Sequence, residues 1–327
     1  MSYRFIWLAS AAAVISLTRP AIPQSANFGG PISGFVYSNT SRMIRPLFGV
    51  PGATYAGAAL MKGVDWASIA PGGAWAFIIR HGHGGGFVGG LSALSPSALA
   101  VDGLIAPVDR VAWSRDGSYA LVYSAPGNVL QRVRFSAGGA SADAPLDLSA
   151  FGAVMSLAID PTGQNIAFGV AGSGLYFFPA GQSPTRIAAL SEPAAIAFDT
   201  TGANLYAADS GQGEIVEFDA GAGPFVFAAL AQPDGSTFQP VGLAVSGGGR
   251  YLLLADGAGQ AVRVYDTASH NLVNSISLAF APTRLEALSS NPAFLLNGSN
   301  SQESLLILDA SQVPSVYFVP APHEARK

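Results

Sequence analysis

The string His81-Gly82-His83-Gly84-Gly85-Gly86 is the most unusual chemical feature of the chain. Two histidines at positions i and i+2 could bind a soft divalent metal, and the glycines would let a ligand approach the backbone. A zinc site needs three or four ligands, however, and the other histidines are His270 and His323, with no cysteine anywhere. We therefore predict a surface loop with no metal and no cofactor.

Four charged residues, Asp65, Arg110, Glu192 and Arg284, each open or directly precede a short apolar segment. If those segments are the inner strands of a ring, the four side chains gather at one mouth of its central channel, together with His81 and His83. Converging charges of both signs could hold a polar ligand, although ordinary salt bridging would produce the same pattern. No residue is predicted to be catalytic.

Three segments of similar sequence carry a short polar residue at the same loop position: Asp209, Asp256 and Asn297. A calcium-binding loop would need further aspartates and a distal glutamate, which are missing. Capping of turns by these short polar side chains is the favoured interpretation.

The elements that position these residues come from a repeat. Short apolar segments recur in pairs joined by tight turns, and the turns lie near residues 73, 117, 163, 202, 248 and 292. A spacing of about 40–45 residues with four strands per unit is typical of a β-propeller. The turns contain Asp-Gly, Thr-Gly and Gly-Gly, which supply the positive φ angles that hairpins need.

A third and a more ragged fourth strand follow most pairs, as in Gly174–Phe178 and Thr185–Leu190. Inner strands such as Ala194–Phe198 are apolar on both faces, and only 11% of all residues are charged, so the sheets are expected to pack face to face. Trp66, Trp75 and Trp113 are predicted to belong to this core.

The two ends of the chain do not fit a simple count. Gly34–Ser38 (GFVYS) looks like a third strand and Met43–Gly49 like a fourth, while Val316–Pro320 is a single strand after the sixth unit. Joining both ends in one blade would remove exposed strand edges. We therefore predict an all-β propeller of seven four-stranded antiparallel blades, closed by N- and C-terminal strands, with six blades as the alternative.

Residues 1–26 differ from the rest. Arg4 precedes an apolar core at Phe5–Leu17, which has the length of a signal peptide and is too short for a comfortable span. An uncleaved anchor is the alternative. We predict a signal peptide at 1–26, one propeller domain at 27–327, and export to the periplasm or the extracellular space, with no membrane span after the signal.

The net charge of −4 and the thin scatter of 16 lysines and arginines give no basis for nucleic-acid binding. The absence of cysteine excludes disulfides and a thiol nucleophile. The expected oligomeric state is a monomer.

The phrases LYAADSGQGEIVEFD (205–219) and LLLADGAGQAVRVYD (252–266) resemble the YVTN and NHL-type propeller repeats. VAWSRDGSYALVYS (111–124) is similar to a WD40-like or Tol-B-like unit. The resemblance covers roughly residues 30–320 and implies the fold. It implies little about activity, because such propellers include scaffolds, lyases, lactonases and redox enzymes.

The favoured function is a non-enzymatic exported module that binds a protein or polymer through its loop faces. The alternative is an enzyme of the lactonase, lyase or sugar-oxidising type with a polar site at the channel mouth. A purely structural propeller is the third possibility.

Overall fold

The computed structural model describes residues 30–80, 84–179, 181–219, 223–229, 238–289, 292–298 and 304–320. In this part of the chain every regular element is a β-strand, apart from one 3-10 turn, η1 (Pro71–Gly73). No helix there is long and apolar enough to cross a membrane. The predicted signal segment and two predicted site residues, His81 and His83, lie outside the described residues.

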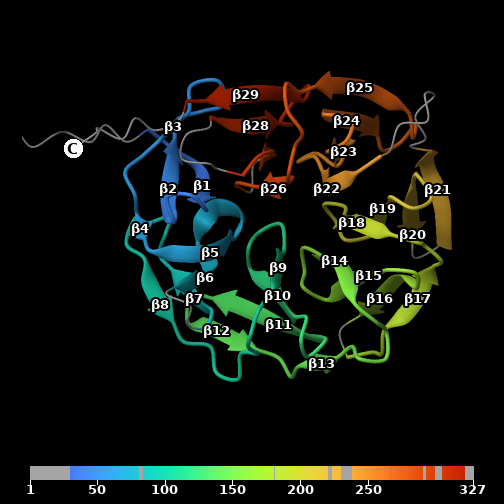
Figure 1. Cartoon of the computed structure of the whole chain (residues 1–327), viewed down its shortest axis with the longest axis horizontal. Helices are drawn as coiled ribbons and strands as arrows, with labels where there is room; N and C mark the ends of the chain where they lie inside the picture. Colours follow the sequence, from blue (N-terminus) through green and yellow to red (C-terminus); the bar gives the residue numbers. More distant parts are fainter. Residues whose placement is uncertain are drawn as a thin grey trace, which may run out of the picture.

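The strands form seven antiparallel sheets arranged in a ring (Figure 1). The sheets follow one another around the ring in chain order, so the first lies beside the seventh. This arrangement confirms the predicted propeller and decides for seven blades over six.

Each sheet is built from consecutive strands. The first contains β1 (Ile32–Ser38), β2 (Met43–Phe48), β3 (Tyr55–Ala56) and β4 (Met61–Lys62). The second contains β5 (Val64–Ile69), β6 (Trp75–Arg80), β7 (Gly86–Gly89) and β8 (Ser97–Leu99). The third contains β9 (Arg110–Trp113), β10 (Tyr119–Ser124), β11 (Val129–Ser136), β12 (Gly139–Ala142) and β13 (Leu146–Asp147).

The fourth contains β14 (Val154–Ile159), β15 (Asn165–Val170), β16 (Gly174–Pro179) and β17 (Thr185–Ala188). The fifth contains β18 (Pro193–Phe198), β19 (Asn204–Asp209), β20 (Glu214–Asp219) and β21 (Gly223–Ala229). The sixth contains β22 (Pro240–Val245), β23 (Tyr251–Asp256), β24 (Ala261–Asp266) and β25 (Leu272–Ser277). The seventh contains β26 (Glu286–Ala287), β27 (Ala293–Leu295), β28 (Leu305–Asp309) and β29 (Ser315–Val319).

Tight turns join the inner strand of the second to sixth blades to the strand behind it. Each turn contains a glycine with φ between 66° and 81°, a range that other residues adopt only with strain. These glycines are Gly73, Gly117, Gly163, Gly202 and Gly249. The turn chemistry of the sequence therefore sets where each blade reverses direction.

The core is divided among the gaps between blades. In the described residues, seven hydrophobic clusters each fill the space between two neighbouring sheets. Phe77 and Phe87, for example, pack between the second and third sheets, with ring centroids 5.1 Å apart. Face-to-face packing explains why the middle strands are apolar on both sides and why few charges are needed.

The prediction that both chain ends share one blade is wrong. Among the described residues, the first sheet uses only N-terminal strands and the seventh only C-terminal strands. The ring closes instead through side chains, because Val36 and Leu47 pack against Leu288, Leu295 and Ile307 of the seventh sheet. Apolar packing between complete sheets thus replaces the predicted backbone pairing.

The interpretation of Gly34–Ser38 as a third strand is also wrong, because β1 runs like a second strand. Its start contacts Leu288, which follows β26, and its end reaches the start of β5, where the Tyr37 hydroxyl donates to the carbonyl of Asp65 at 2.5 Å. It therefore runs opposite to the inner strands β5 and β26. Its burial matches the second strand β10, whose Tyr123 similarly approaches the start of β14.

Candidate functional site

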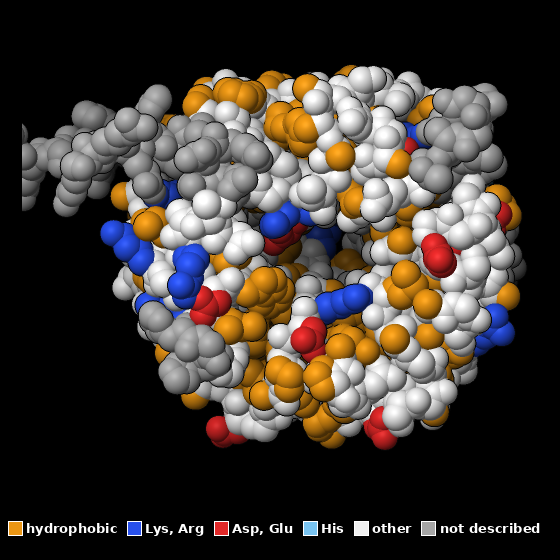
Figure 2. Space-filling model, viewed as in Figure 1, with side chains coloured by type: hydrophobic (Ala, Val, Ile, Leu, Met, Phe, Trp, Pro, Cys, Tyr) orange, Lys and Arg blue, Asp and Glu red, His pale blue; other side chains and the backbone are white. Residues whose placement is uncertain are grey.

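A cavity of about 840 Å³ lies at the centre of the ring. Figure 2 shows the hollow, with basic and acidic side chains around it. Six inner strands, β5, β9, β14, β18, β22 and β26, line it with runs of consecutive residues, whereas the end of β1 contributes only Tyr37 and Asn39. The cavity is therefore the axial channel that the fold was expected to enclose.

The cavity has two ends, which we name by the strands that form them. At the start mouth the inner strands begin, and the lining residues there include Asp65 and Arg284, while Glu286 lies further along the wall, level with Ser68. At the turn mouth the inner strands end in their hairpin turns, and the lining residues there are Pro71, Arg115, Pro161 and Asp199.

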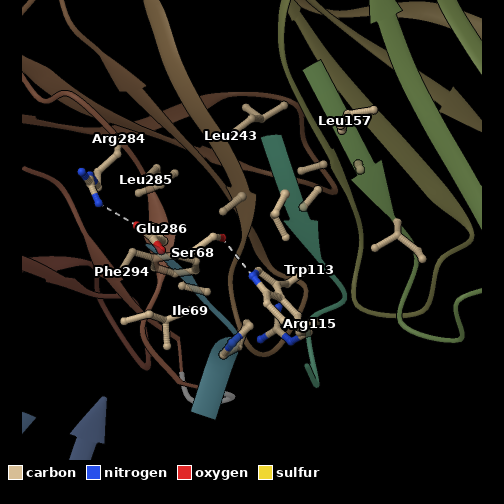
Figure 3. A pocket seen from close by; sticks show the side chains of 18 of the residues that line it. Ser68, Ile69, Trp113, Arg115, Leu157, Leu243, Arg284, Leu285, Glu286 and Phe294 are labelled. Carbon is tan, nitrogen blue, oxygen red and sulfur yellow. Dashed lines mark hydrogen bonds and ion pairs between the residues drawn. The ribbon is translucent and has the colours of Figure 1, made fainter. Parts of the chain in front are cut away.

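Two of the predicted charges, Asp65 and Arg284, line the cavity at the start mouth. Each already has a partner: Asp65 forms an ion pair with Arg42, and Nη1 of Arg284 lies 2.8 Å from Oε2 of Glu286. Figure 3 shows the Arg284–Glu286 pair on the cavity wall. Opposite charges are therefore balanced within the protein at this end.

The hydroxyl of Tyr37 stays protonated beside these pairs. Burial raises the pKa of Tyr37, and the positive charges of Arg42 and Arg284 offset that effect only in part. The hydroxyl is thus available as a hydrogen-bond donor, and the carbonyl of Asp65 accepts it.

The other two predicted charges, Arg110 and Glu192, are not among the residues that line the cavity. The Arg110 guanidinium donates to the carbonyls of Val154, at 3.0 Å, and Met155 in the next blade. The Glu192 carboxylate accepts the hydroxyl of Ser210 at 2.9 Å. The structure therefore brings Asp65 and Arg284 to the cavity, while Arg110 and Glu192 make contacts around it.

Arg115 at the turn mouth was not singled out from the sequence. Its Nη1 donates to the carbonyl of Val245 at a distance of 3.0 Å. Val245 lies at the end of β22, 130 positions further along the chain. The side chain therefore extends from the third blade to the sixth. A signal did exist in the repeat: Pro71, Arg115, Pro161, Thr200 and Gly247 stand at the same place in five aligned turns, and Arg115 alone is charged.

Aromatic and small polar side chains form part of the cavity wall. The indole Nε1 of Trp113 donates to the hydroxyl of Ser68 at 3.0 Å, as Figure 3 shows, and both residues line the cavity, as does Trp66. Trp75 instead stacks on Phe135 with a centroid distance of 5.3 Å. All three tryptophans contact the core between the second and third blades, as predicted, but Trp66 and Trp113 also reach the cavity.

The loop residues Asp209, Asp256 and Asn297 act as turn caps, as predicted. The buried Asp209 carboxylate accepts the backbone N–H groups of Ser191 at 2.7 Å and Glu192 at 2.8 Å. Asp256 accepts from Gly259 and Asn297 from Leu306. Within the described ranges, no group of three or more His, Asp or Glu side chains could hold a metal.

A separate polar cluster lies between the fifth and sixth blades, away from the cavity lining. Glu217 is 6% exposed, and its Oε2 lies 3.7 Å from Nε2 of His270. Burial raises the pKa of Glu217, and the hydrogen bond from Tyr206 opposes that effect. The ring of His270 also packs on Phe227, with centroids 4.6 Å apart, so this cluster joins two blades rather than opening to a ligand.

Comparison with known proteins places the chain by fold. No protein-family model matches it, and no curated protein matches its sequence. A "putative 6-phosphogluconolactonase" from Bacteroides uniformis is similar, with 14% identity, a TM-score of 0.63, and coverage of 88% of this chain and 96% of that one. Sqt1 from Chaetomium thermophilum is similar at 14% identity and a TM-score of 0.55, with 89% and 83% of the two chains covered.

A chain of a nidogen–laminin complex is also similar, at 14% identity and a TM-score of 0.53, with 79% of this chain and 99% of that one covered. At such low identity the three likenesses show a shared fold alone.

Proposed function

We propose that this propeller is a binding module that accepts a polar ligand in its central cavity. The observation that carries the proposal is the cavity itself, which has the volume of a small-molecule site and mixes aromatic, hydroxyl and charged side chains. All seven blades contribute to its walls, six of them through their inner strands, so the site is rigid wherever the ring is intact.

The state of the lining carboxylates favours binding over catalysis. A general acid or base must be within reach of the proton that it transfers. Asp65 and Glu286 are held in ion pairs, and Asp199 accepts the N–H groups of Thr201 at 2.9 Å and Ala203 at 3.0 Å. These are the carboxylates that line the cavity in the described part of the chain, and each is occupied by the protein.

We propose that the polar ligand is part of a larger protein or polymer partner. The loops around the two mouths would contact the remainder of that partner. The proposal also includes export, on the basis of the apolar segment Phe5–Leu17. N-terminal sequencing of secreted protein should find the first residue between 21 and 27. Recovery of the protein with its N-terminus intact inside the cell would contradict this part.

We further propose membership of the YVTN and NHL-like repeats. Support comes from the two phrases 205–219 and 252–266, which fall on the second and third strands of adjacent blades.

The central test fills the cavity. Ala197→Phe places a ring among the lining residues of β18, while Ala268→Phe adds the same ring at an exposed turn outside the cavity. A thermal-shift screen of sugars, sugar acids, amino acids and short peptides should find a class that raises the Tm by about 2 °C or more. Ala197→Phe should remove that shift and Ala268→Phe should keep it.

The proposal fails if no compound stabilises the protein, or if the shift survives in Ala197→Phe. Ala244→Phe, on the lining of β22, repeats the test at an independent position, so a local folding defect in one variant does not decide the result.

A lactone-hydrolysing enzyme is the second candidate, favoured by the likeness to the Bacteroides uniformis structure. Asp65 and Arg284 are the predicted residues that would then act at the start mouth. Hydrolysis of glucono-δ-lactone by the purified protein, lost in Asp65→Asn and retained in Arg250→Met, would favour this candidate over simple binding.

A further inference from the structure

Two basic side chains line the cavity in the described residues, and they differ in their surroundings. Arg284 has its carboxylate partner, Glu286, at 2.8 Å. Arg115 has no carboxylate within ion-pair distance among the residues that the structure describes. Its positive charge is therefore the one on the cavity wall that the described protein does not balance.

The environment of Arg115 makes an unpaired positive charge unfavourable in free energy. The side chain is partly buried, and burial lowers its pKa; neither the adjacent Asp116 nor Asp199 forms an ion pair with it. A guanidinium carries five N–H donors, and the carbonyl of Val245 is the one acceptor described for it. Because partly desolvated charge is unfavourable without a partner, the site gains most from an anion that accepts the remaining donors.

We propose that the guanidinium of Arg115 anchors a carboxylate or phosphate group of the ligand at the turn mouth. This inference rests on the proposed function, since it concerns the same cavity. Arg115 is already held in place by its hydrogen bond to Val245, so an anion would meet a side chain whose direction is set in advance.

The residues near Arg115 indicate what the anionic group is attached to. Trp113 lies two positions before it and beside it in Figure 3, and Ser68 on the same wall shares a hydrogen bond with that indole. Leu157 and Leu243 line the cavity from the fourth and sixth blades. A compact ring that bears hydroxyls and one acidic group, such as a sugar acid or sugar phosphate, matches this combination of apolar, indole and hydroxyl surface.

Asp199 is the acidic residue that lines the cavity at the same mouth, and it does not neutralise the charge of Arg115. Its Oδ1 accepts the N–H groups of Thr201 at 2.9 Å, Gly202 at 2.5 Å and Ala203 at 3.0 Å. These donors spread the negative charge into the turn after β18, where it stabilises the backbone.

Tryptophan fluorescence of the full chain gives a direct test, because Trp66 and Trp113 line the cavity. The probes are D-glucuronate, glucose 6-phosphate, inorganic phosphate and neutral D-glucose, at one ionic strength. Glucuronate, glucose 6-phosphate or both should change the emission saturably, and glucose should bind at least about 10-fold more weakly than the better anion. The two sugar anions separate a carboxylate from a phosphate preference, and inorganic phosphate shows whether the ring is needed.

Arg115→Met should lower the affinity for the better anion by at least about 10-fold, because one charge-assisted contact is lost. Arg115→Lys, which keeps the charge, should bind more tightly than Arg115→Met. Arg250→Met, which removes an outer arginine whose side chain is 71% exposed, is the matched control and should bind like the wild type. Trp113→Phe should reduce the signal if the change arises in the cavity.

The outcomes separate the two proposals. Saturable binding that treats glucose and the anions alike, or that is unchanged in Arg115→Met, overturns the role of Arg115 and leaves the cavity as a binding site. A ligand with a Kd of about 1 mM would nearly saturate the site at about 10 mM. If no probe changes the emission up to that concentration, the anion site is overturned. In that case the thermal-shift screen with Ala197→Phe decides separately whether the cavity binds other ligands.

Discussion

The two mouths of the cavity hold their charges in opposite ways. At the start mouth, Arg284 forms an ion pair with Glu286, which lies further along the wall, and the two side chains are about one-third exposed, at 34% and 35%. At the turn mouth, Arg115 is fixed by a backbone carbonyl of a distant blade and has no acidic partner among the described residues. One end is balanced and solvated, and the other carries an unbalanced charge in a rigid frame.

The frame of the turn mouth comes from contacts between each turn and the preceding blade. Gly73 faces the ring of Phe35, Gly163 faces Tyr119, and Gly202 lies against Asp160. Because these turns touch the preceding blades, a side chain placed there has little freedom. For the proposed ligand, we therefore expect selectivity to arise at the turn mouth rather than at the start mouth.

The largest expected effect comes from breaking the frame of the turn mouth with Gly73→Ala. The added Cβ would overlap the ring of Phe35, and Gly73 has φ of 66°. We expect a loss of about 2–4 kcal/mol in the free energy of unfolding, measured by urea denaturation.

Gly249→Ala is the matched control, because Gly249 has the same place in the turn of the sixth blade, with φ of 76°, and its Cβ would meet only the hydroxyl of Thr200 at 3.4 Å. It should lose only the cost of the positive φ, about 1–2 kcal/mol. Equal losses in the two variants would show that the overlap with Phe35 does not matter.

A smaller effect is expected from Asp116, which holds the turn that carries Arg115. Burial alone would raise the pKa of Asp116, but hydrogen bonds from Ser114 and Ser118 outweigh it and lower the pKa below its usual value. The ionised form therefore contributes stability above about pH 4, the usual carboxyl pKa, and this contribution is lost as the pH falls further through the lowered value.

Asp116→Asn removes this titration. The stability difference between wild type and Asp116→Asn should thus be constant near neutral pH and shrink as the solution is acidified below pH 4, when followed by thermal unfolding at a series of pH values. A difference that is flat across the acidic range would mean that the turn does not depend on the charge of Asp116.

The smallest effect is expected at the start mouth. Arg284→Met breaks the ion pair with Glu286, and partly exposed pairs contribute less than about 1 kcal/mol. The loss, measured by urea denaturation, should decrease further at high salt because the pair is screened. A loss larger than that of Gly73→Ala would remove the contrast between the two mouths.

The repeat made the ring predictable, and local chemistry explains why. Glycines at the turns near 73, 117, 163 and 202 need positive φ whatever surrounds them, so their spacing reports the hairpins directly. The same reasoning located the caps at Asp209 and Asp256, whose carboxylates accept the backbone N–H groups of Gly211 and Gly259, because such a cap acts within a few residues.

The first blade shows where local patterns were insufficient. Phe35-Val36-Tyr37-Ser38 closely matches Leu121-Val122-Tyr123-Ser124 of the second strand β10, and that likeness gives the position of β1 correctly. Strand order inferred from the chain ends gave the wrong position. Alternating apolar residues are common to second and third strands, so periodicity alone could not distinguish them.

The candidate site was predictable only in part. Asp65 and Arg284 were expected at the cavity because inner strands begin at one mouth of a propeller, and both line it. Arg110 and Glu192 share that place in the sequence but contact Met155 and Ser210 instead. His81 and His83 lie outside the described residues.

The sequence by itself determined the β-propeller, its hairpin turns and its apolar blades, because these depend on φ preferences and on a side-chain period of two residues. Only the tertiary structure decided how the ring closes and which charges remain unbalanced. Those properties depend on contacts between residues far apart in the chain, such as Arg115 with Val245, and no local pattern encodes such a distance.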